Sequence, residues 1–186
     1  MSAELLLQSR LVTKPAVEPV TLVGAAVSAL PARRKNAFAG EISDVLAQYP
    51  HFLGQLSANE IRTAMDKGKF ALVVDHPTYP YTLFSGAQVL GPLKDPHLLD
   101  KPLPETTMVV GTWVSLRGFG KRALNAAADH AAAQPNVRAV TALVGETNAI
   151  AMEKIRKTNA LEVGSRPSER VKGPNGAAQV IVFRLR

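Results

Sequence analysis

One segment constrains the fold of this chain more than any other, and it spans residues 106–133. The β-branched run TTMVVGTWVSL at 106–116 is typical of a buried strand. The stretch RGFGKRALNAAADHAAA at 117–133 turns into an alanine-rich helix, which Pro135 ends. Glycines at 118 and 120 permit a sharp turn between the two. A strand that feeds directly into a helix in this way predicts a layered fold with helices packed on a sheet.

The remaining segments alternate in the same manner. We expect helices at 38–47, from Ser57 to about Lys67, and at 146–158, and strands at 70–75, 81–90, 139–145 and in two closing runs around KGPNG. Ser57 and Glu60 form a capping box. Residues 91–105 are predicted to be a loop insertion, and residues 1–37 a poorly defined N-terminal segment. The sequence thus predicts one α/β (α+β) domain over 1–186, with a mixed central sheet flanked by helices.

The composition excludes several kinds of chemistry. The chain has no cysteine, which excludes disulfides, thiolate metal ligands and a cysteine nucleophile. Its four histidines show no metal-ligand spacing, so no metal is expected. The longest charge-free stretch, His76 to Leu93, contains three prolines and is too short to span a membrane, and MSAELLLQSR does not resemble a secretory signal. We therefore expect a soluble, cytoplasmic protein without a membrane partner.

The net charge of +7 is unevenly distributed along the chain. Residues 1–100 carry nine basic and nine acidic side chains, whereas residues 101–186 carry thirteen basic and six acidic ones. A one-sided basic surface favours a polyanionic partner such as nucleic acid, an anionic membrane or a phosphate-rich cofactor. The alternative is a solvated face with no specific partner.

The turn at 117–122 concentrates features that suit a phosphate. Gly118 and Gly120 leave backbone amides uncovered, and the start of the following helix adds unpaired N–H groups and a positive dipole. Arg117, Lys121 and Arg122 place three positive charges at the same point. The loop therefore predicts binding of a phosphate or pyrophosphate; a glycine-rich turn without a ligand is the alternative.

A dinucleotide-binding fold is one candidate for this loop. Gly118-x-Gly120-x-x-Ala123 fits the fingerprint G-x-G-x-x-G/A, and Glu146 stands at the end of the next strand. That fold uses its fingerprint at the first strand of a long parallel sheet. The forty residues after Glu146 allow only one helix and two strands, which disfavours it.

The loop more closely resembles that of the GCN5-related N-acetyltransferase (GNAT) superfamily, whose acetyl-CoA loop has the pattern R/Q-x-x-G-x-G/A. Arg117, Gly118 and Gly120 stand as in the common R-G-x-G form, while Arg122 occupies the last small-residue position. Asn148 follows the next strand as in many members, and Lys157 matches the lysine of their Tyr-x-Lys-x-Gly-Phe motif. The motif's tyrosine, glycine and phenylalanine are replaced by Ile155, Asn159 and Ala160. The order of elements agrees over residues 38–186.

The resemblance implies an acetyl-CoA site and direct acyl transfer to an amine, with no covalent enzyme intermediate. Backbone groups of Trp113, Val114 and Leu116 would line the pantetheine arm and polarise the thioester carbonyl. The remaining cofactor-binding candidates are Arg117, Gly118, Phe119, Gly120, Lys121 and Arg122 for the pyrophosphate, and Asn148 for the pantetheine. Two of these residues also suit a structural role: Asn148 as a helix N-cap, and Trp113 as a core side chain.

The catalytic residues are not identified by the sequence. Many relatives use a strand glutamate to deprotonate the amine and the motif's tyrosine to protonate the thiolate. Here the strand has no carboxylate, Ile155 cannot donate a proton, and Glu105 precedes the strand. His76, Tyr79 and Tyr81 are possible substitutes, and deprotonation through water is a further option.

Three functions therefore remain open at this stage. The first is an acetyl-CoA-dependent N-acetyltransferase acting on an unidentified amine, with a homodimer among the open oligomeric states. The second is a GNAT-fold protein that binds CoA without catalysis, because the tyrosine and carboxylate are missing. The third is a basic nucleic-acid-binding module, which is disfavoured because Phe183 is the only aromatic residue among the last 66.

Overall fold

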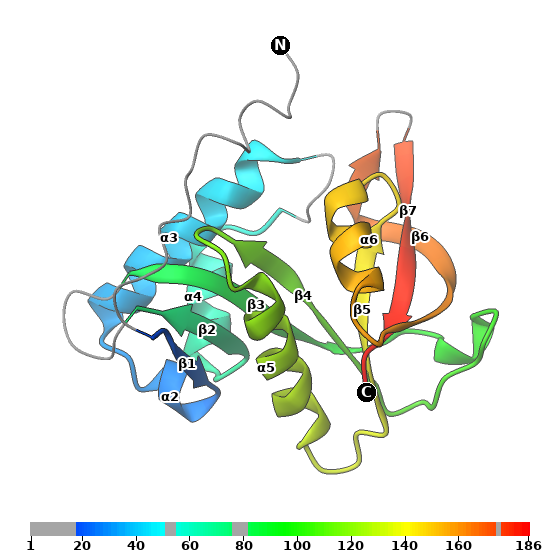
Figure 1. Cartoon of the computed structure of the whole chain (residues 1–186), viewed down its shortest axis with the longest axis horizontal. Coiled ribbons are helices and arrows are strands. Elements are labelled where there is room, and N and C mark those ends of the chain that lie inside the picture. Colours follow the sequence, from blue (N-terminus) through cyan, green and yellow to red (C-terminus); the bar gives the residue numbers. More distant parts are fainter. Residues whose placement is uncertain (1–17, 51–54, 76–81, 174–175) are drawn as a thin grey trace.

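The described residues form one mixed seven-stranded sheet (Figure 1). The structure is a computed structural model, and it describes residues 18–50, 55–75, 82–173 and 176–186. The strand order is β1-β2-β3-β4-β5-β7-β6, with β4 and β5 parallel and the other neighbours antiparallel. The strands are β1 (Val20–Val23), β2 (Phe70–Val74), β3 (Leu83–Pro92), β4 (Thr107–Ser115), β5 (Ala139–Gly145), β6 (Leu161–Gly173) and β7 (Gly176–Arg184).

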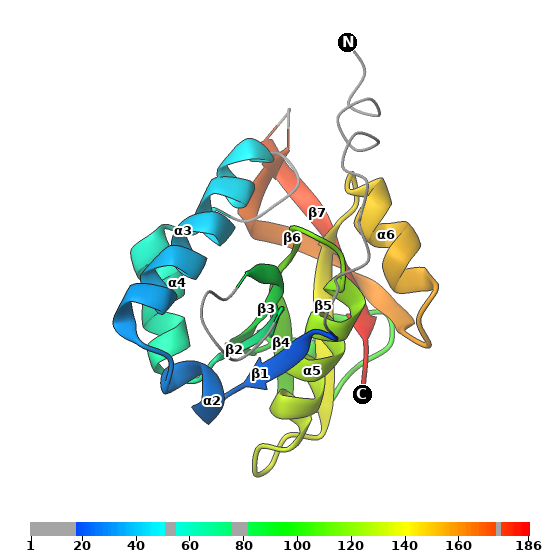
Figure 2. The same ribbon diagram turned by 60° about the vertical axis from the view of Figure 1, so that its left-hand side comes forward.

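Helices cover both faces of the sheet (Figure 2). On one face lie α3 (Ala32–Gln48) and α4 (Ala58–Asp66), and on the other α5 (Gly120–Ala132) and α6 (Ala149–Arg156). The short helix α2 (Ala25–Ser28) follows β1, and a 3-10 turn, η1 (Pro96–Leu98), lies between β3 and β4. Among the described residues, no helix has the length and apolar character needed to cross a membrane. The predicted α+β class with a mixed sheet flanked by helices is confirmed.

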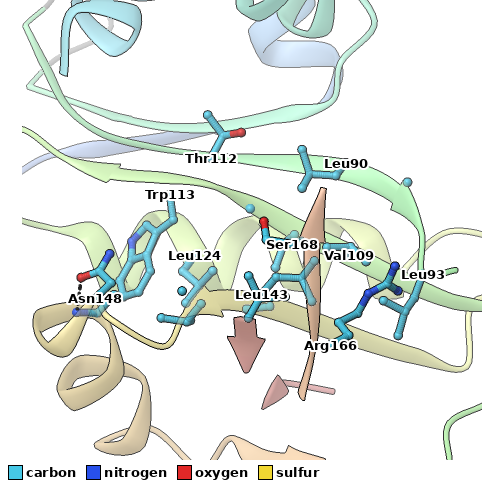
Figure 3. A pocket seen from close by; sticks show the side chains of 18 of the residues that line it. Leu90, Leu93, Val109, Thr112, Trp113, Leu124, Leu143, Asn148, Arg166 and Ser168 are labelled. Atoms are coloured by element: carbon cyan, nitrogen blue, oxygen red, sulfur yellow. Dashed lines mark hydrogen bonds between the residues drawn. The ribbon is translucent and has the colours of Figure 1, made fainter. Parts of the chain in front are cut away.

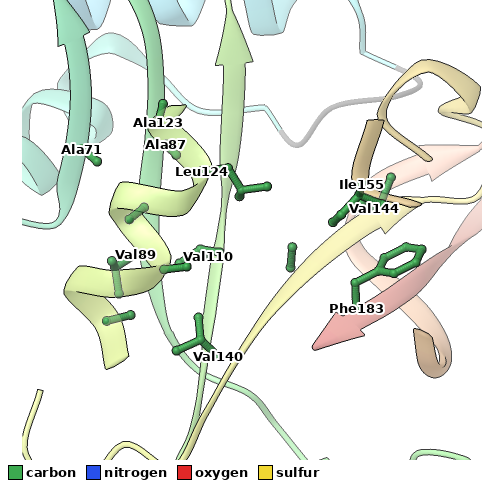
Figure 4. Close-up of a cluster of buried hydrophobic side chains, with 14 of the residues drawn as sticks. Ala71, Ala87, Val89, Val110, Ala123, Leu124, Val140, Val144, Ile155 and Phe183 are labelled. Atoms are coloured by element: carbon green, nitrogen blue, oxygen red, sulfur yellow. The ribbon is translucent and has the colours of Figure 1, made fainter. Parts of the chain in front are cut away.

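The face that carries α5 and α6 is packed around alanines (Figure 4). Ala123, Ala127 and Ala131 are fully buried, which confirms that this face of α5 packs closely on the sheet. Strand residues of odd number in β2 and even number in β5 point to the same side, as the two-residue period of a strand requires. The opposite face holds a second core beneath α3 and α4.

Within the segment 1–37, predicted to be poorly defined, the described residues 18–37 contain β1, α2 and the start of α3. The helix predicted at 38–47 begins six residues earlier, at Ala32. Its first turns carry no apolar stripe; instead the buried Lys35 ammonium donates to the carbonyl oxygen of Ser28 at 2.9 Å and pairs with Asp66 of α4 at 2.5 Å. The hydrogen bond that Lys35 donates to Asp66 lowers the pKa of the Asp66 carboxyl. A tertiary ion pair thus orders a segment that hydrophobic spacing does not reveal.

The segment 91–105, predicted to be a loop insertion, has no strand after Pro92 and contains the short 3-10 turn η1, and its leucines pack against the sheet. Leu93, Leu99 and Leu103 are buried and form a third core with Val163 and Val182. The amide of Lys101 also donates to the carbonyl of Val163 at 3.0 Å. The leucines are irregularly spaced, so neither a helical nor a strand period marks them as core residues.

Strands β4 and β5 separate part of the way along their length. Their parallel ladder runs from the pair Thr107–Ala139 to the pair Val110–Ala142 and ends there. Beyond that point β4 continues beside β3 as far as Ser115, and β5 continues beside β7 as far as Gly145. Thr112, with φ of 46°, bends β4 just after the ladder ends. The sheet therefore has an opening between two of its central strands.

The predicted capping box at the start of α4 is confirmed and provides a test of the fold. The Ser57 hydroxyl accepts from the Glu60 amide at 3.3 Å, and the Ser57 amide donates to the Glu60 carboxylate at 2.8 Å. We predict that Ser57→Ala lowers the free energy of unfolding by about 1 kcal/mol, as urea denaturation would measure. Ser57→Asn, which keeps a capping oxygen, is the matched control; an equal loss in both variants would contradict the prediction.

Candidate functional site

A cavity of about 330 Å³ lies in the opening between β4 and β5 (Figure 3). Its walls include the backbone of β4 after the ladder ends (Gly111, Thr112 and Trp113) and of β5 after the same point (Leu143 to Gly145). The lining is mainly apolar, with a few polar side chains, which is typical of a small-molecule site.

The cavity passes from one face of the sheet to the other. Leu124 of α5 and Ala151 of α6 line it on one face. Leu46 of α3, together with Leu90 and Leu93 of the third core, lines it on the opposite face. The cavity is therefore lined from both faces of the sheet.

Trp113 connects the cavity to the glycine-containing loop. Its side chain is partly buried against the α5–α6 core and lines the cavity (Figure 3). The indole Nε1–H donates to the carbonyl oxygen of Gly120 at 2.6 Å. A Cβ added at Gly120 would lie 2.9 Å from that Nε1 atom and 3.0 Å from the Cβ of Ser115. Trp113 is therefore part of the cavity wall as well as of the core. Only glycine fits at position 120 without a shift of the neighbouring atoms.

The loop before α5 leaves the N-terminus of the helix open. Gly118 and Phe119 have φ values of 94° and 65°, and the Phe119 ring stacks on Phe84 with centroids 5.6 Å apart. The Ser85 hydroxyl donates to the carbonyl of Gly118, which fixes the turn. No side chain caps α5, and its first intrahelical bond comes from the amide of Ala123. The amides of residues 120–122 therefore point out of the helix end.

Two of the three basic residues of the loop are directed elsewhere. The Arg117 guanidinium donates to the carbonyl of Leu83 and lies 3.2 Å from the carboxylate of Glu41. The Nε of Arg122 donates to the hydroxyl of Thr21 on β1 at 2.7 Å. Lys121 is exposed at the first turn of α5. In this structure the two arginine side chains are bonded to groups on β3 and β1, and binding of an anion by all three charges stays a prediction.

The backbone groups expected to line the pantetheine differ in their availability. The amide of Leu116 donates to the carbonyl of Phe84 at 2.9 Å, so it faces β3 and not the opening. Val114 pairs with Gly86 of β3, and its side chain is buried in the core under α3 and α4. Trp113 lines the cavity. Of these three residues, Trp113 alone lines the opening.

Asn148 has the first of its two predicted roles, the helix cap, and its role toward pantetheine stays a prediction. Its side-chain oxygen accepts from the amide of Ala151 at 3.1 Å, which confirms the helix N-cap of α6. The same residue lines the cavity on the side of Trp113 (Figure 3).

The described lining contains no carboxylate, imidazole or phenol. Glu105 is exposed at the start of β4, 3.3 Å from His97, and does not line the cavity. Ile155 is fully buried in the α5–α6 core, where the figure shows it beside Val144 (Figure 4). A tyrosine there would have to bury its hydroxyl in an apolar core. The other candidates, His76, Tyr79 and Tyr81, lie outside the described residues.

The structure adds lining residues that the sequence analysis missed. They are Lys94, just after β3, and Arg166 and Ser168 on β6. These residues are separated by about seventy positions in the sequence and belong to no local motif, so no sequence signal marks them. In the described part of the chain, no three histidine, aspartate or glutamate side chains gather into a metal site.

Comparisons with known proteins support the fold. No family model matches the chain, and no curated protein matches its sequence. Among solved structures, it is similar to a ribosomal-protein-alanine N-acetyltransferase from Brucella melitensis (TM-score 0.60, 12% identity, covering 89% of this chain and 98% of that one). It is also similar to yncA, a putative acetyltransferase from Salmonella typhimurium with its cofactor acetyl-CoA (TM-score 0.62, 12% identity, covering 91% of this chain and 94% of that one). Arabidopsis thaliana NAA60 in complex with acetyl-CoA is a third example (TM-score 0.58, 14% identity, covering 80% of this chain and 93% of that one).

These structures share an arrangement of strands and helices with this chain at very low sequence identity. The chain therefore has the GNAT fold, and the resemblance found in the loop at 117–122 is confirmed at the level of the fold.

The contact between Trp113 and Gly120 yields a direct test, because Trp113 is the single tryptophan. We predict that Gly120→Ala displaces the indole, shifts its fluorescence to longer wavelength and lowers the free energy of unfolding by about 1–3 kcal/mol.

Gly40→Ala is the matched control, because a Cβ at Gly40 of α3 meets no atom within 4 Å. It should leave the fluorescence unchanged and stabilise the helix by about 0.5–1 kcal/mol. A Gly120→Ala protein with the parent's spectrum and stability would contradict the close approach of the Trp113 indole to position 120.

Proposed function

We propose that this protein transfers an acetyl group from acetyl-CoA to an amine. The observation that carries this proposal is the cavity between β4 and β5, whose lining residue Trp113 bonds to Gly120 at the uncapped N-terminus of α5. Two solved structures with the same fold hold acetyl-CoA.

In this proposal the pyrophosphate of CoA lies on the loop before α5. The amides of Gly118, Phe119, Gly120, Lys121 and Arg122 would donate to its oxygens, aided by the positive end of the helix dipole. Lys121, exposed at the first turn, supplies the nearest charge. Arg117 and Arg122 contribute mainly by holding the loop against β3 and β1, through their bonds to Leu83 and Thr21.

The pantetheine arm would enter the opening along the edge of β4. Beyond Val110 this edge no longer pairs with β5, so its backbone groups are left for a ligand to bond. Trp113 and Asn148 flank the entrance from the α5–α6 face. A backbone amide that donates to the thioester oxygen would stabilise the developing oxyanion by about 3–4 kcal/mol, the range known for such donors.

The reaction itself requires little from the described side chains. The lone pair of the amine attacks the thioester carbon, the carbon–sulfur bond breaks, and CoA leaves as its thiolate. A thiol with a pKa of about 8.5 is a tolerable leaving group without a general acid. Because the described lining offers no base, we propose that the ammonium proton passes to solvent water. Loss of general acid–base help slows such a reaction by about 10²–10⁴-fold and does not abolish it.

Binding of acetyl-CoA is tested by calorimetric titration of two charge-reversal variants. We predict that Lys121→Glu weakens the affinity by about tenfold, because it places a carboxylate beside the pyrophosphate. Lys67→Glu, at the exposed C-terminal end of α4, changes the net charge equally and should bind as the parent does. Equal affinities in all three proteins would remove the loop from the cofactor site.

The pH dependence of CoA release tests the route of the proton. If solvent accepts it, the enzymatic rate should rise about tenfold per pH unit until the amine's own pKa, about 10.4 for a lysine-like amine. Free-thiol release, corrected for the uncatalysed reaction, measures this rate. A plateau beginning near pH 6.5 would reveal an imidazole base. Acetyl-CoA binding without any release would favour a non-catalytic CoA-binding protein.

A further inference from the structure

We propose that the acceptor is a small primary amine on an uncharged, apolar body, and that Leu90 limits the size of this body. The inference rests on the proposed acetyl transfer, and it adds the class of acceptor and a residue that selects it. It follows from a bulge in β3, from the position of Leu90 over a glycine, and from the apolar wall around both.

A β-bulge in β3 places Leu90 at the opening. Val89 of β3 pairs with Val110 of β4, and Gly91 pairs with Val109, so Leu90 is an additional residue between two consecutive pairs. Gly91, with φ of 141°, has a backbone conformation that favours glycine. Val110 also forms the last pair of the ladder between β4 and β5. The bulge therefore stands beside the point at which these two strands separate, and a bulge of this kind re-aims the side chain that it carries.

The Leu90 side chain lies over the backbone of β4 at the first position beyond the ladder. That position is Gly111, and a Cβ added there would lie 2.6 Å from Cδ1 of Leu90 and 3.4 Å from its Cγ. The end of Leu90 thus fills the space that a side chain at position 111 would take. Leu90 is only half-buried and lines the cavity, so part of its surface is left for a ligand (Figure 3).

The wall around Leu90 is apolar on the face away from α5 and α6. Val109 of β4 and Leu143 of β5 each precede a residue of the α5–α6 core, so their side chains point to the other side of the sheet. Together with Leu90 and Leu93, they pack in the third core and line the cavity. An apolar group of the acceptor is therefore stabilised when it leaves water for this side of the opening.

The two cationic lining residues, Lys94 and Arg166, contribute no charge to this inference. Both are engaged in contacts within the chain, and the Arg166 guanidinium donates to the carbonyl of Lys94 at 2.8 Å. No aspartate or glutamate is among the described lining residues. A second ammonium group on the acceptor would therefore leave water without a carboxylate partner in the described lining, which is costly. The apolar wall disfavours any charged end for the same reason.

The volume of the cavity favours a small molecule. It is about 330 Å³, at the small end of ligand sites, and the acetyl end of the cofactor must share it. A short alkyl chain that lies against Leu90, with its amine directed to the opening, uses the remaining space. Little room is left for the chain that continues from a protein N-terminus.

The experiment compares amines of one chain length that differ at the far end: hexylamine, 5-amino-1-pentanol, 1,5-diaminopentane and 5-aminopentanoate. Rates of CoA release, given as kcat/KM per concentration of unprotonated amine, remove differences in amine basicity. We expect hexylamine to exceed each polar analogue by about tenfold or more, because an apolar wall does not replace the hydration of a polar end. An equal or higher kcat/KM for any polar analogue would overturn the inference.

A tripeptide that begins with leucine offers an amine on an apolar body from a protein source. It should react more slowly than hexylamine, because the cavity is small. A higher kcat/KM for the tripeptide would overturn the assignment of a small-molecule acceptor.

Two substitutions at Leu90 test its role in size selection. Leu90→Ala should raise the kcat/KM of octylamine relative to butylamine by about tenfold, and Leu90→Phe should lower the same ratio. Shifts in opposite directions do not arise from a loss of stability alone. Leu22→Ala is the matched control, because Leu22 of β1 is a half-buried strand leucine that does not line the cavity. It should keep the parent's ratio, and an unchanged ratio in both Leu90 variants would overturn the role of Leu90.

A binding measurement separates this inference from the proposed function. Trp113, the single tryptophan, lines the same cavity, so its fluorescence should report binding of N-hexylacetamide, the expected product, to the protein alone. We expect this amide to bind about tenfold more tightly than N-(5-hydroxypentyl)acetamide. Its affinity should fall in Leu90→Ala and stay unchanged in Leu22→Ala. Equal affinities of the two amides would contradict the apolar site.

The outcomes distinguish the two proposals. If acetyl-CoA does not bind but the amides behave as expected, the proposed function fails and the apolar site stands. If acetyl transfer proceeds without a preference for hexylamine, the inference is overturned and acetyl transfer stands. A changed preference among acetyl-, butyryl- and hexanoyl-CoA in Leu90→Ala, with one amine throughout, would assign Leu90 to the acyl donor and also overturn the inference.

Discussion

The separation of β4 from β5 after the pair Val110–Ala142 is the constraint on which the rest of the site depends. A central strand that loses a partner exposes backbone donors and acceptors, and burying them without partners is costly. Here each strand keeps its other neighbour, since β4 stays paired with β3 and β5 with β7. The sheet therefore remains one body while an apolar cavity with a polar backbone edge opens through it. Thr112, a β-branched residue at positive φ, lies where β4 bends away, and such backbone strain is characteristic of functional positions.

The loop before α5 and the cavity are mechanically joined. Trp113 bonds to the carbonyl of Gly120, Ser85 bonds to the carbonyl of Gly118, and Phe119 stacks on Phe84. Each contact ties the loop to β3 or β4. The uncapped N-terminus of α5 is therefore placed relative to the opening by contacts with the sheet, which is what the proposed ligand, extending from one to the other, requires.

Charged groups are unevenly distributed around the cavity. Lys94 and Arg166 line the cavity, whereas Lys121 lies on the first turn of α5 and is not among the lining residues. Elsewhere the described lining is apolar or weakly polar and offers no base, with Ile155 buried in the core where the GNAT motif has tyrosine. Under the proposed acetyl transfer, this arrangement favours catalysis by positioning and by polarisation of the thioester, with protons exchanged through water.

Much of the fold was determined by the sequence alone, because the responsible interactions are local. The capping box at Ser57, the Asn148 cap and the alanine face of α5 involve residues three or four positions apart, and hydrophobic periodicity located most strands and helices. Only the tertiary structure decided the remainder. Lys35 pairs with Asp66 to extend α3, Arg117 and Arg122 turn toward neighbouring strands, and Lys94 meets Arg166 across about seventy residues. A side chain's direction and a distant partner depend on how layers pack, and no local spacing in the chain encodes them.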